Sequence, residues 1–241
     1  EKQAPPAPAR APFQDIADVR FVGPEAEPYK QIEVELVNGS TRTLDLNLAL
    51  AGTDIFYIHV GPDDLIYGSS ILPLHLFRFA PATGELVDLG KASSTGGEAY
   101  SMANLDGKLY ISAYTGATLS VYDPTRTYAF GNTPESNPRD LGRMDKISYR
   151  PRSTLAGPGG KVWVASIPDY GMWGGPLSWY DPATGEKKAY YEVVGEASCY
   201  TLAYLAQPDL IAVGTTIQAG SGTTPKVRQA VLFLWDHKAE T

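Results

Sequence analysis

Short runs in which apolar and polar residues alternate follow one another along most of the chain, separated by turns rich in Gly, Pro and Asp. Examples are DIFYIHV (54–60), LIYGSSI (65–71) and AYSMANL (99–105). Alternation with a period of two, in runs rich in Tyr, Val, Ile and Trp, predicts β-strands. No segment shows the apolar spacing of an amphipathic helix, so we expect an all-β fold.

One phrase occurs four times, as LFRFAPATGELVDL (76–89), LSVYDPTRT (119–127), LSWYDPATGEKKAYY (177–191) and LFLWDHKAE (232–240). A strand, a turn and a second strand precede each copy, and a further strand follows most of the DPATG-like turns. Four short strands at a period of roughly 45–55 residues predict the blades of a β-propeller, with four antiparallel strands per blade. Asp-Pro followed by Thr-Gly is turn chemistry, so Asp123 and Asp181 are expected to cap turns rather than act as catalytic acids.

The expected first and second strands of the four blades are 54–60 and 65–71, 99–105 and 108–114, 152–157 and 161–167, and 199–205 and 210–217. The expected fourth strands are 85–90, 139–142 and 186–194. The number of blades stays open. A hairpin at 31–48 with an Asn-Gly turn either completes the last blade or belongs to a partial fifth blade at about 20–50, and the third alternative is part of a longer propeller. We expect residues 1–20, rich in Pro and Ala, to form a flexible leader and residues 21–241 to form one propeller domain.

Composition excludes several classes of function. Hydrophobic residues make up 43% of the 241 residues, enough to bury a core. The net charge is −7 and basic residues form no stripe, so we expect no nucleic-acid partner. The single Cys199 cannot form an intrachain disulfide, and no Cys/His group has zinc spacing. No apolar run is long enough to span a membrane, and the GSGTTP loop lacks the ending of a phosphate-binding loop.

The connections between strands fall into two sets that differ in character. One set is stereotyped, with GPDD, LDGK, GPGG and PATGE turns. The other set varies and carries functional side chains, so we expect the site on that face, over the mouth of the central channel. Its loops are 69–75, 113–117, 167–175 and 215–229, together with 48–54, 93–100, 145–152 and 195–200.

Five residues of these loops are candidates for catalysis. Arg150 and Arg152 alternate along the chain and so point to the same side of a strand, which suits bidentate binding of a carboxylate or sulfate. Tyr170, Tyr114 and His75 are candidate proton carriers. The structural alternatives are an arginine paired with a blade carboxylate, an exposed turn tyrosine and a histidine at the rim of the core.

Four more residues are candidates for substrate binding. Tyr100 and Trp173 could stack on a sugar ring, although packing between blades is the commoner use of such side chains. Glu98 and Asp169 could hold a cation such as calcium, but no calcium-loop spacing supports this. We therefore expect no cofactor, with a divalent cation as the alternative.

The runs GPDDLIYGSSILPLHLFRFAPATGELVDLG, GGEAYSMANLDGKLYISAYTGATLSVYDP and YRPRSTLAGPGGKVWVASIPDYGMWGGPLSWYDPATG resemble bacterial and fungal β-propeller proteins of polysaccharide breakdown. The resemblance is to lyases that act on uronic acids, such as rhamnose–glucuronate lyases, and covers roughly residues 50–237. Those lyases usually have seven blades, for which this chain is too short.

The resemblance implies β-elimination on an acidic glycan or oligosaccharide, outside the cytoplasm, in the periplasm or the extracellular space. Arg150 and Arg152 would neutralise the developing charge, and Tyr170, Tyr114 or His75 would serve as base and acid. This assignment predicts that Arg152→Ala abolishes uronate cleavage. The rival hypotheses are a non-catalytic propeller that binds a glycan or a protein on the same face, and a lyase or hydrolase that uses a divalent cation.

Overall fold

The computed structural model describes residues 16–23, 31–45 and 54–241 of the chain. The Cα positions divide the chain into two compact units, residues 1–49 and residues 50–241. Residues 1–15 of the expected leader lie outside the described residues, and residues 16–20 belong to the strand β1 (Ile16–Phe21).

The first unit contains one antiparallel sheet in the order β1-β2-β3, formed by Ile16–Phe21, Gln31–Leu36 and Thr41–Asp45. The predicted Asn-Gly turn joins β2 to β3, with Gly39 at φ +81° and the Asn38 side chain accepting a hydrogen bond of 2.9 Å from the Ser40 amide. The described pairing partners of β2 are β1 and β3. The place of this hairpin in the propeller stays a prediction.

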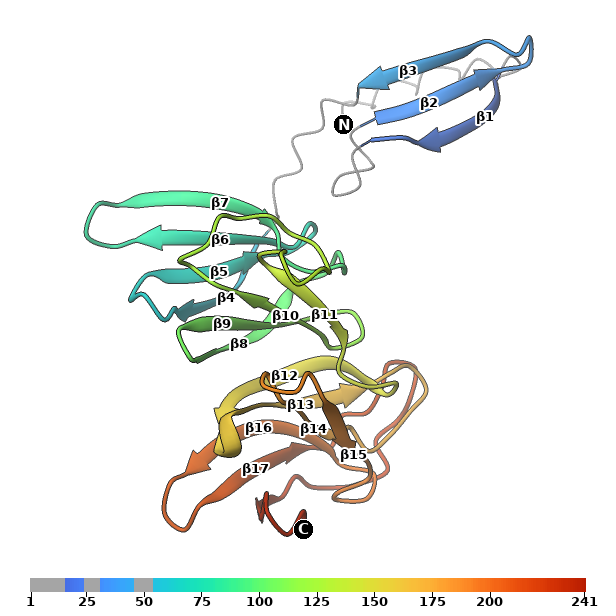
Figure 1. Cartoon of the computed structure of the whole chain (residues 1–241). Helices are drawn as coiled ribbons and strands as arrows, with labels where there is room; N and C mark the ends of the chain where they lie inside the picture. The colour runs from blue at the N-terminus through green and yellow to red at the C-terminus, as the bar shows by residue number, and fades with distance from the viewer. Residues whose placement is uncertain (1–15, 24–30, 46–53) are drawn as a thin grey trace, which may run out of the picture. The chain divides into compact units, whose positions relative to one another are not determined.

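The second unit consists of four antiparallel sheets that follow one another along the chain (Figure 1). The first three have the four strands that the repeat predicts, and the last has three described strands. The first is β4 (Ile55–Val60), β5 (Ile66–Ser70), β6 (His75–Ala80) and β7 (Glu85–Lys91). The second is β8 (Ala99–Leu105), β9 (Lys108–Ala113), β10 (Thr118–Tyr122) and β11 (Arg139–Arg143). The third is β12 (Ser148–Gly157), β13 (Lys161–Pro168), β14 (Leu177–Tyr180) and β15 (Lys187–Tyr190), and the last is β16 (Ser198–Leu205), β17 (Leu210–Thr216) and β18 (Leu232–Trp235).

The first strands of the sheets lie beside one another, because β8 contacts β4 and β12, and β12 contacts β16 (Figure 1). The hydrophobic core is divided accordingly into three clusters, one between each pair of neighbouring blades. Tyr67 and Ile111 are buried between the first two blades, Leu119 and Val164 between the second and third, and Trp163 between the third and fourth. Burial of such alternating faces against the next sheet is what holds the blades together.

The turns after the third strands are capped as expected. Asp123 Oδ1 accepts a hydrogen bond of 2.9 Å from the Thr125 amide, and Asp181 Oδ1 accepts one of 2.8 Å from the Ala183 amide. The prediction that both aspartates are turn residues is confirmed.

One expected loop is a strand. Residues 145–152 were expected to be a connection, but β12 begins at Ser148 and includes both Arg150 and Arg152. The long partner strand β13 explains the extension, because Pro168 and Ile167 pair with Ser148 and Arg150. The two arginines are therefore held by a sheet rather than by a flexible loop.

The only helical element in the described ranges is a 3₁₀ turn at Pro158–Gly160. No helix among the described residues has the length and apolar character needed to cross a membrane.

Candidate functional site

Each of the four first strands carries a β-bulge at the same position. The bulge inserts one extra residue opposite the second strand, and these residues are Phe56, Tyr100, Arg152 and Tyr200. The residues that follow them pair with equivalent positions of the second strands. A bulge redirects a side chain out of the regular alternation, and such bulges are common beside functional sites.

The four bulge residues touch in sequence across the blades, and we call them the bulge row. The rings of Phe56 and Tyr100 are 5.0 Å apart, edge to face. The Arg152 guanidinium carbon lies 4.6 Å from the Tyr100 ring centre and 5.5 Å from the Tyr200 ring centre. Arg152 therefore stands between two tyrosines, one from each neighbouring blade.

A second group forms around Arg150. Its guanidinium carbon lies 5.2 Å from the ring centre of Tyr114 and 5.6 Å from those of Tyr149 and Tyr170. The Tyr149 ring packs edge to face against the other two rings, at centroid distances of 5.2 Å and 5.3 Å. The Arg150 Nη2 donates a hydrogen bond of 3.1 Å to the Ser221 hydroxyl. We call these five residues the Arg150 cluster.

The environment of the Arg150 cluster drives the pKa values of two tyrosines in opposite directions. The Tyr114 side chain, as the largest influence, and those of Arg150 and Ser221 lower the pKa of Tyr170. The interaction with Tyr170, followed by burial, raises the pKa of Tyr114. Opposite shifts in two neighbouring phenols suit them to different roles in a proton transfer.

Glu98 is the carboxyl group beside both arginines. Its side chain is buried, with 8% exposed, and burial raises its pKa against the opposing effects of a hydrogen bond with Tyr100 and the charges of Arg150 and Arg152. Neither arginine forms an ion pair within 4.0 Å with any residue that the structure describes. One buried carboxyl thus faces two guanidinium groups.

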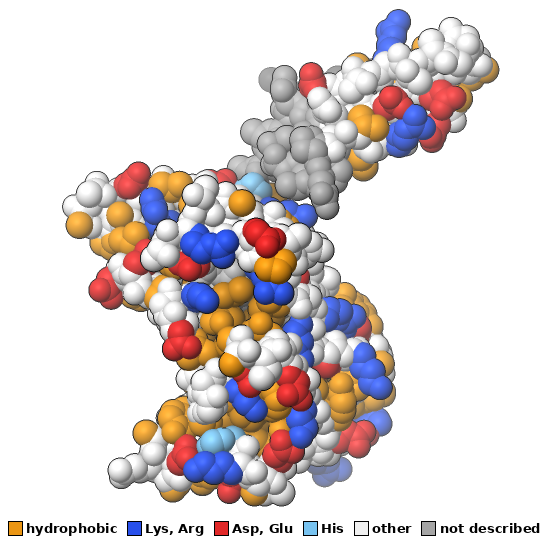
Figure 2. All heavy atoms as spheres, viewed as in Figure 1, with side chains coloured by type: hydrophobic (Ala, Val, Ile, Leu, Met, Phe, Trp, Pro, Cys, Tyr) orange, Lys and Arg blue, Asp and Glu red, His pale blue; other side chains and the backbone are white. Residues whose placement is uncertain are grey.

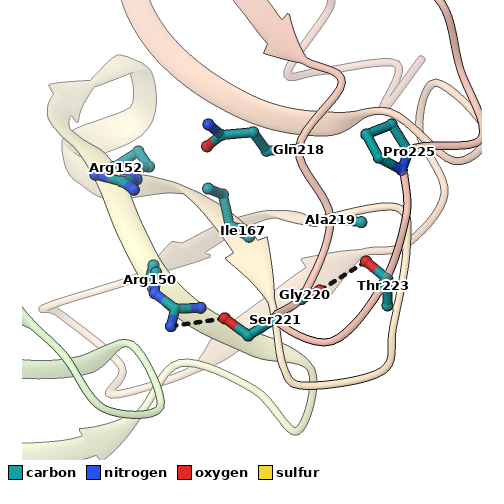
Figure 3. Close-up of a pocket in the computed structure, with 9 residues that line it drawn as sticks. All are labelled: Arg150, Arg152, Ile167, Gln218, Ala219, Gly220, Ser221, Thr223 and Pro225. Carbon is teal, nitrogen blue, oxygen red and sulfur yellow. Dashed lines mark hydrogen bonds between the residues drawn. The ribbon is translucent and has the colours of Figure 1, made fainter.

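The two arginines line a pocket of about 380 Å³ (Figure 3). Its opposite wall is the loop between β17 and β18, which contributes Gln218, Gly220, Ser221 and Thr223. Arg150 points toward Ser221 in this view, whereas Arg152 lies at the other end of the lining (Figure 3). The pocket is large enough for a small ligand and has a cation at two places on its wall.

Three of the predicted site residues make their contacts elsewhere. His75 begins β6, and its Nδ1 lies 3.0 Å from the Asp88 carboxylate of β7. Asp169 accepts a hydrogen bond of 2.7 Å from the Tyr170 amide and lies 3.5 Å from Arg143 Nη2. Neither side chain has a contact with Arg150 or Arg152 in the described part of the chain.

Trp173 contacts the pocket loop rather than the pocket. Its Nε1 donates a hydrogen bond of 2.9 Å to the Thr224 carbonyl, and Lys226 Nζ lies 3.9 Å from the centre of the Trp173 ring. Lys226 in turn pairs with Glu196 at 2.5 Å. Trp173 thus helps to hold the loop that carries Ser221.

Sequence reasoning identified six of the clustered residues and missed Phe56, Tyr149, Tyr200 and Ser221. Aligning the first strands as IFYI, AYSM, PRST and CYTL shows an aromatic residue at one position in three blades and Arg152 in the other. That alignment alone would have found Phe56 and Tyr200. No sequence signal distinguishes Ser221 from the other Ser and Thr residues of its loop.

Basic and acidic side chains are interspersed over the face shown in Figure 2. Among the residues that the structure describes, no group of three or more His, Cys, Asp or Glu side chains is arranged to hold a metal ion. The expectation of no cofactor and its alternative, a divalent cation such as calcium, both stay predictions.

No protein-family model matches the chain, and no curated protein matches its sequence. Among solved structures, it is similar to hydrazine synthase of Kuenenia stuttgartiensis, with 13% identity and a TM-score of 0.55 over 88% of this chain and 58% of that one. A streptogramin B lyase has 13% identity and a TM-score of 0.49 over 76% of this chain and 55% of its own. YCF48 bound to a D1 peptide has 13% identity and a TM-score of 0.46 over 86% of this chain and 65% of its own.

The predicted β-propeller fold is confirmed by the four antiparallel blades and by the likeness to the hydrazine synthase structure. The chain spans between 55% and 65% of the length of these three structures. At such low identity the likeness concerns the fold alone.

Proposed function

We propose that this propeller cleaves uronic-acid-containing glycans by β-elimination in the pocket between β12 and the β17–β18 loop. The observation that carries the proposal is the position of Arg150 against the Tyr114 and Tyr170 rings, at 5.2 Å and 5.6 Å from their centres, with opposite pKa shifts at the two phenols. The sequence resemblance to uronate lyases supports the class of substrate.

Three residues of the Arg150 cluster have roles in this reaction. Arg150 binds the uronate carboxylate and stabilises the negative charge that develops on it when the adjacent carbon loses its proton. Tyr170 accepts that proton as its phenolate, which the three donors around its oxygen favour. Tyr114 keeps its proton to a higher pH and gives it to the glycosidic oxygen that leaves.

The two tyrosines account for every proton that moves in the reaction. The C–H bond next to the carboxylate and the C–O bond to the leaving sugar break, and a C=C bond forms between the two carbons. Tyr170 ends protonated and Tyr114 ends as the phenolate, so transfer of one proton along their hydrogen bond restores both. Because the two phenols touch, they act on the same side of the sugar ring, and the elimination is syn.

Arg150 rather than Arg152 is assigned to neutralise the charge, because Arg150 contacts both phenols and Arg152 contacts Tyr100 and Tyr200 instead. His75 takes no part in this reaction, because its Nδ1 contacts the Asp88 carboxylate. A glycan substrate fits an extracellular or periplasmic location, which we retain as part of the proposal.

The test is the ultraviolet absorbance of the unsaturated uronate product, followed while the chain is incubated with a panel of uronate-containing glycans. We expect turnover that rises with pH through the lowered pKa of Tyr170 and is lost in Tyr170→Phe. The matched control is Tyr191→Phe, which removes the hydroxyl of an exposed tyrosine outside the Arg150 cluster. A flat trace with the folded parent protein across the panel would refute the lyase.

The alternative is a non-catalytic propeller that binds an acidic glycan or an acidic protein segment in the same pocket. The observation in its favour is that two arginines without ion-pair partners among the described residues suffice for binding an anion. Binding with no product absorbance, unchanged in Tyr170→Phe, would decide for this alternative.

A further inference from the structure

The bulge row places one cation in an otherwise aromatic line. Phe56, Tyr100 and Tyr200 occupy the bulge position in three blades, and Arg152 occupies it in the third of the four. The bulge aims all four side chains to the same side, as their mutual contacts show. The backbone bulge therefore fixes the direction in which the Arg152 side chain points.

Part of the hydrogen-bonding capacity of Arg152 is unused. Its Nε is buried and has no hydrogen-bond partner among the described residues. Tyr100 and Tyr200 lie beside its guanidinium group, which leaves the nitrogens at its edge to bind a ligand. A planar group with several N–H donors at one edge fits a carboxylate or a sulfate in bidentate fashion.

Arg150 and Arg152 belong to different groups of side chains within one pocket. Arg150 lies among Tyr114, Tyr149 and Tyr170, whereas Arg152 lies in the bulge row, and both line the same cavity of about 380 Å³. The buried Glu98 can balance one of the two positive charges at most. Like charges held together in a pocket repel each other unless anions from a ligand compensate them.

We propose that the bulge row is a second subsite for an acidic group, so that the ligand of this pocket carries two acidic groups, one on Arg150 and one on Arg152. Tyr100 and Tyr200 then hold the Arg152 guanidinium between them while it binds the second group. The inference rests on the proposed function only for the sugar chemistry of the ligand. It concerns binding and needs no catalytic step.

The experiment compares two ligands that differ by one charge. One is a disaccharide of two uronic acids, and the other is the same disaccharide with one carboxyl reduced to the primary alcohol. Affinities are measured by isothermal titration calorimetry on the full chain carrying Tyr170→Phe, so that neither ligand is consumed. We expect the diacid to bind about 10- to 100-fold more tightly, the range expected for a charged hydrogen-bonded contact.

Arg152→Gln in the same background is expected to remove this preference and to leave the affinity for the monoacid within about twofold, because Arg150 is untouched. Arg152→Lys keeps the charge without the planar edge and should keep only part of the preference. Arg126→Gln, which removes a positive charge from the turn between β10 and β11, is the matched control and should keep all of it. Thermal unfolding of each variant checks that it is folded.

Equal affinity of the parent for the two ligands overturns the inference, and so does a preference that survives Arg152→Gln in folded protein. The inference and the lyase proposal can fail separately. A preference for the diacid without product absorbance in the chain with Tyr170 intact supports the subsite and refutes the lyase. Turnover without a preference for the diacid supports the lyase and refutes the subsite. If neither ligand binds and no turnover occurs, both proposals are refuted.

Discussion

The phenols of Tyr114 in the second blade and Tyr170 in the third interact with each other, and the Arg150 guanidinium lies against both rings. The two side chains differ in exposure as well as in pKa, since Tyr170 is 54% exposed whereas Tyr114 is partly buried. Tyr170, with its lowered pKa, can accept a proton beside Arg150, and Tyr114, with its raised pKa, keeps its proton to a higher pH. Such a pair is suited to proton transfer. The pair lies against Arg150, which lines the pocket.

Replacing Tyr114 by Phe is expected to raise the pKa of Tyr170, because the largest of the influences that lower it is removed. The measurement is an NMR titration of the tyrosine ring carbons, with Tyr170→Phe used to assign the signal. Turnover, if the lyase proposal holds, should fall by about 10²- to 10⁴-fold. Tyr149→Phe keeps the ring that packs against both phenols, and it should leave the titration of Tyr170 close to that of the parent. An unchanged pKa in Tyr114→Phe would show that the bond does not control Tyr170.

Gly220→Ala tests whether the pocket loop must lie where it does. A Cβ at Gly220 would stand 1.8 Å from the Asp169 carbonyl oxygen, so the loop has to move and Ser221 loses its 3.1 Å contact with Arg150. We expect weaker binding of acidic ligands by calorimetry and destabilisation of about 0.5–3 kcal/mol by denaturant unfolding. The control is Gly222→Ala, where φ is +82° but no atom lies within 4 Å of the new Cβ. It should cost about 1–2 kcal/mol, because an L-residue is strained in the left-handed region, and leave binding unaltered. Equal binding losses in both variants would show that the position of the loop is not the cause.

Glu98→Gln is expected to stabilise the protein at neutral pH. Burial raises the folded-state pKa of Glu98, so the stability that its protonated form contributes is present below the unfolded pKa, near 4.5, and is lost as the pH rises through the raised folded value. The amide carries no charge to bury and can still accept the Tyr100 hydrogen bond. The gain in Tm over the parent should therefore be larger at pH 7.5 than at pH 4. The same gain at both pH values would mean that the charge of Glu98 is not the cause.

Cys199 should be unreactive in the folded protein. It lies in the core between the third and fourth blades, with 1% of its surface exposed, and burial raises the pKa of its thiol to about 12. A thiol disulfide reagent should modify it only as fast as these blades open, and fully in denaturant. Rapid and complete labelling under native conditions would show that this part of the core is open to solvent.

The repeat predicted much of the fold correctly. The turns depend on local chemistry, such as the Asp123 and Asp181 caps, and the strands on alternation within each run, so both could be recognised along the chain. The expected strand at 99–105 matches β8 residue for residue. The error at 145–152 arose because the length of β12 depends on its pairing with β13, which no pattern within that segment reveals.

The candidate site was predicted in part. Arg150, Arg152, Tyr100, Tyr114, Tyr170 and Glu98 come together as the loop argument expected. His75 does not join them, because its strand turns it toward Asp88. Residue type and loop position identified candidates, but neither could show which side chains point into the same space.

By itself, the sequence determined the class of fold, the blade repeat, most strands and the kind of side chains available to a site, because these depend on periodicity and turn chemistry over a few residues. Only the tertiary structure decided which of those side chains meet. The Tyr114–Tyr170 bond and the Tyr100–Arg152–Tyr200 contacts each join different blades. Their geometry follows from how one sheet packs on the next and from bulges defined only by pairing, and both are properties of the folded chain.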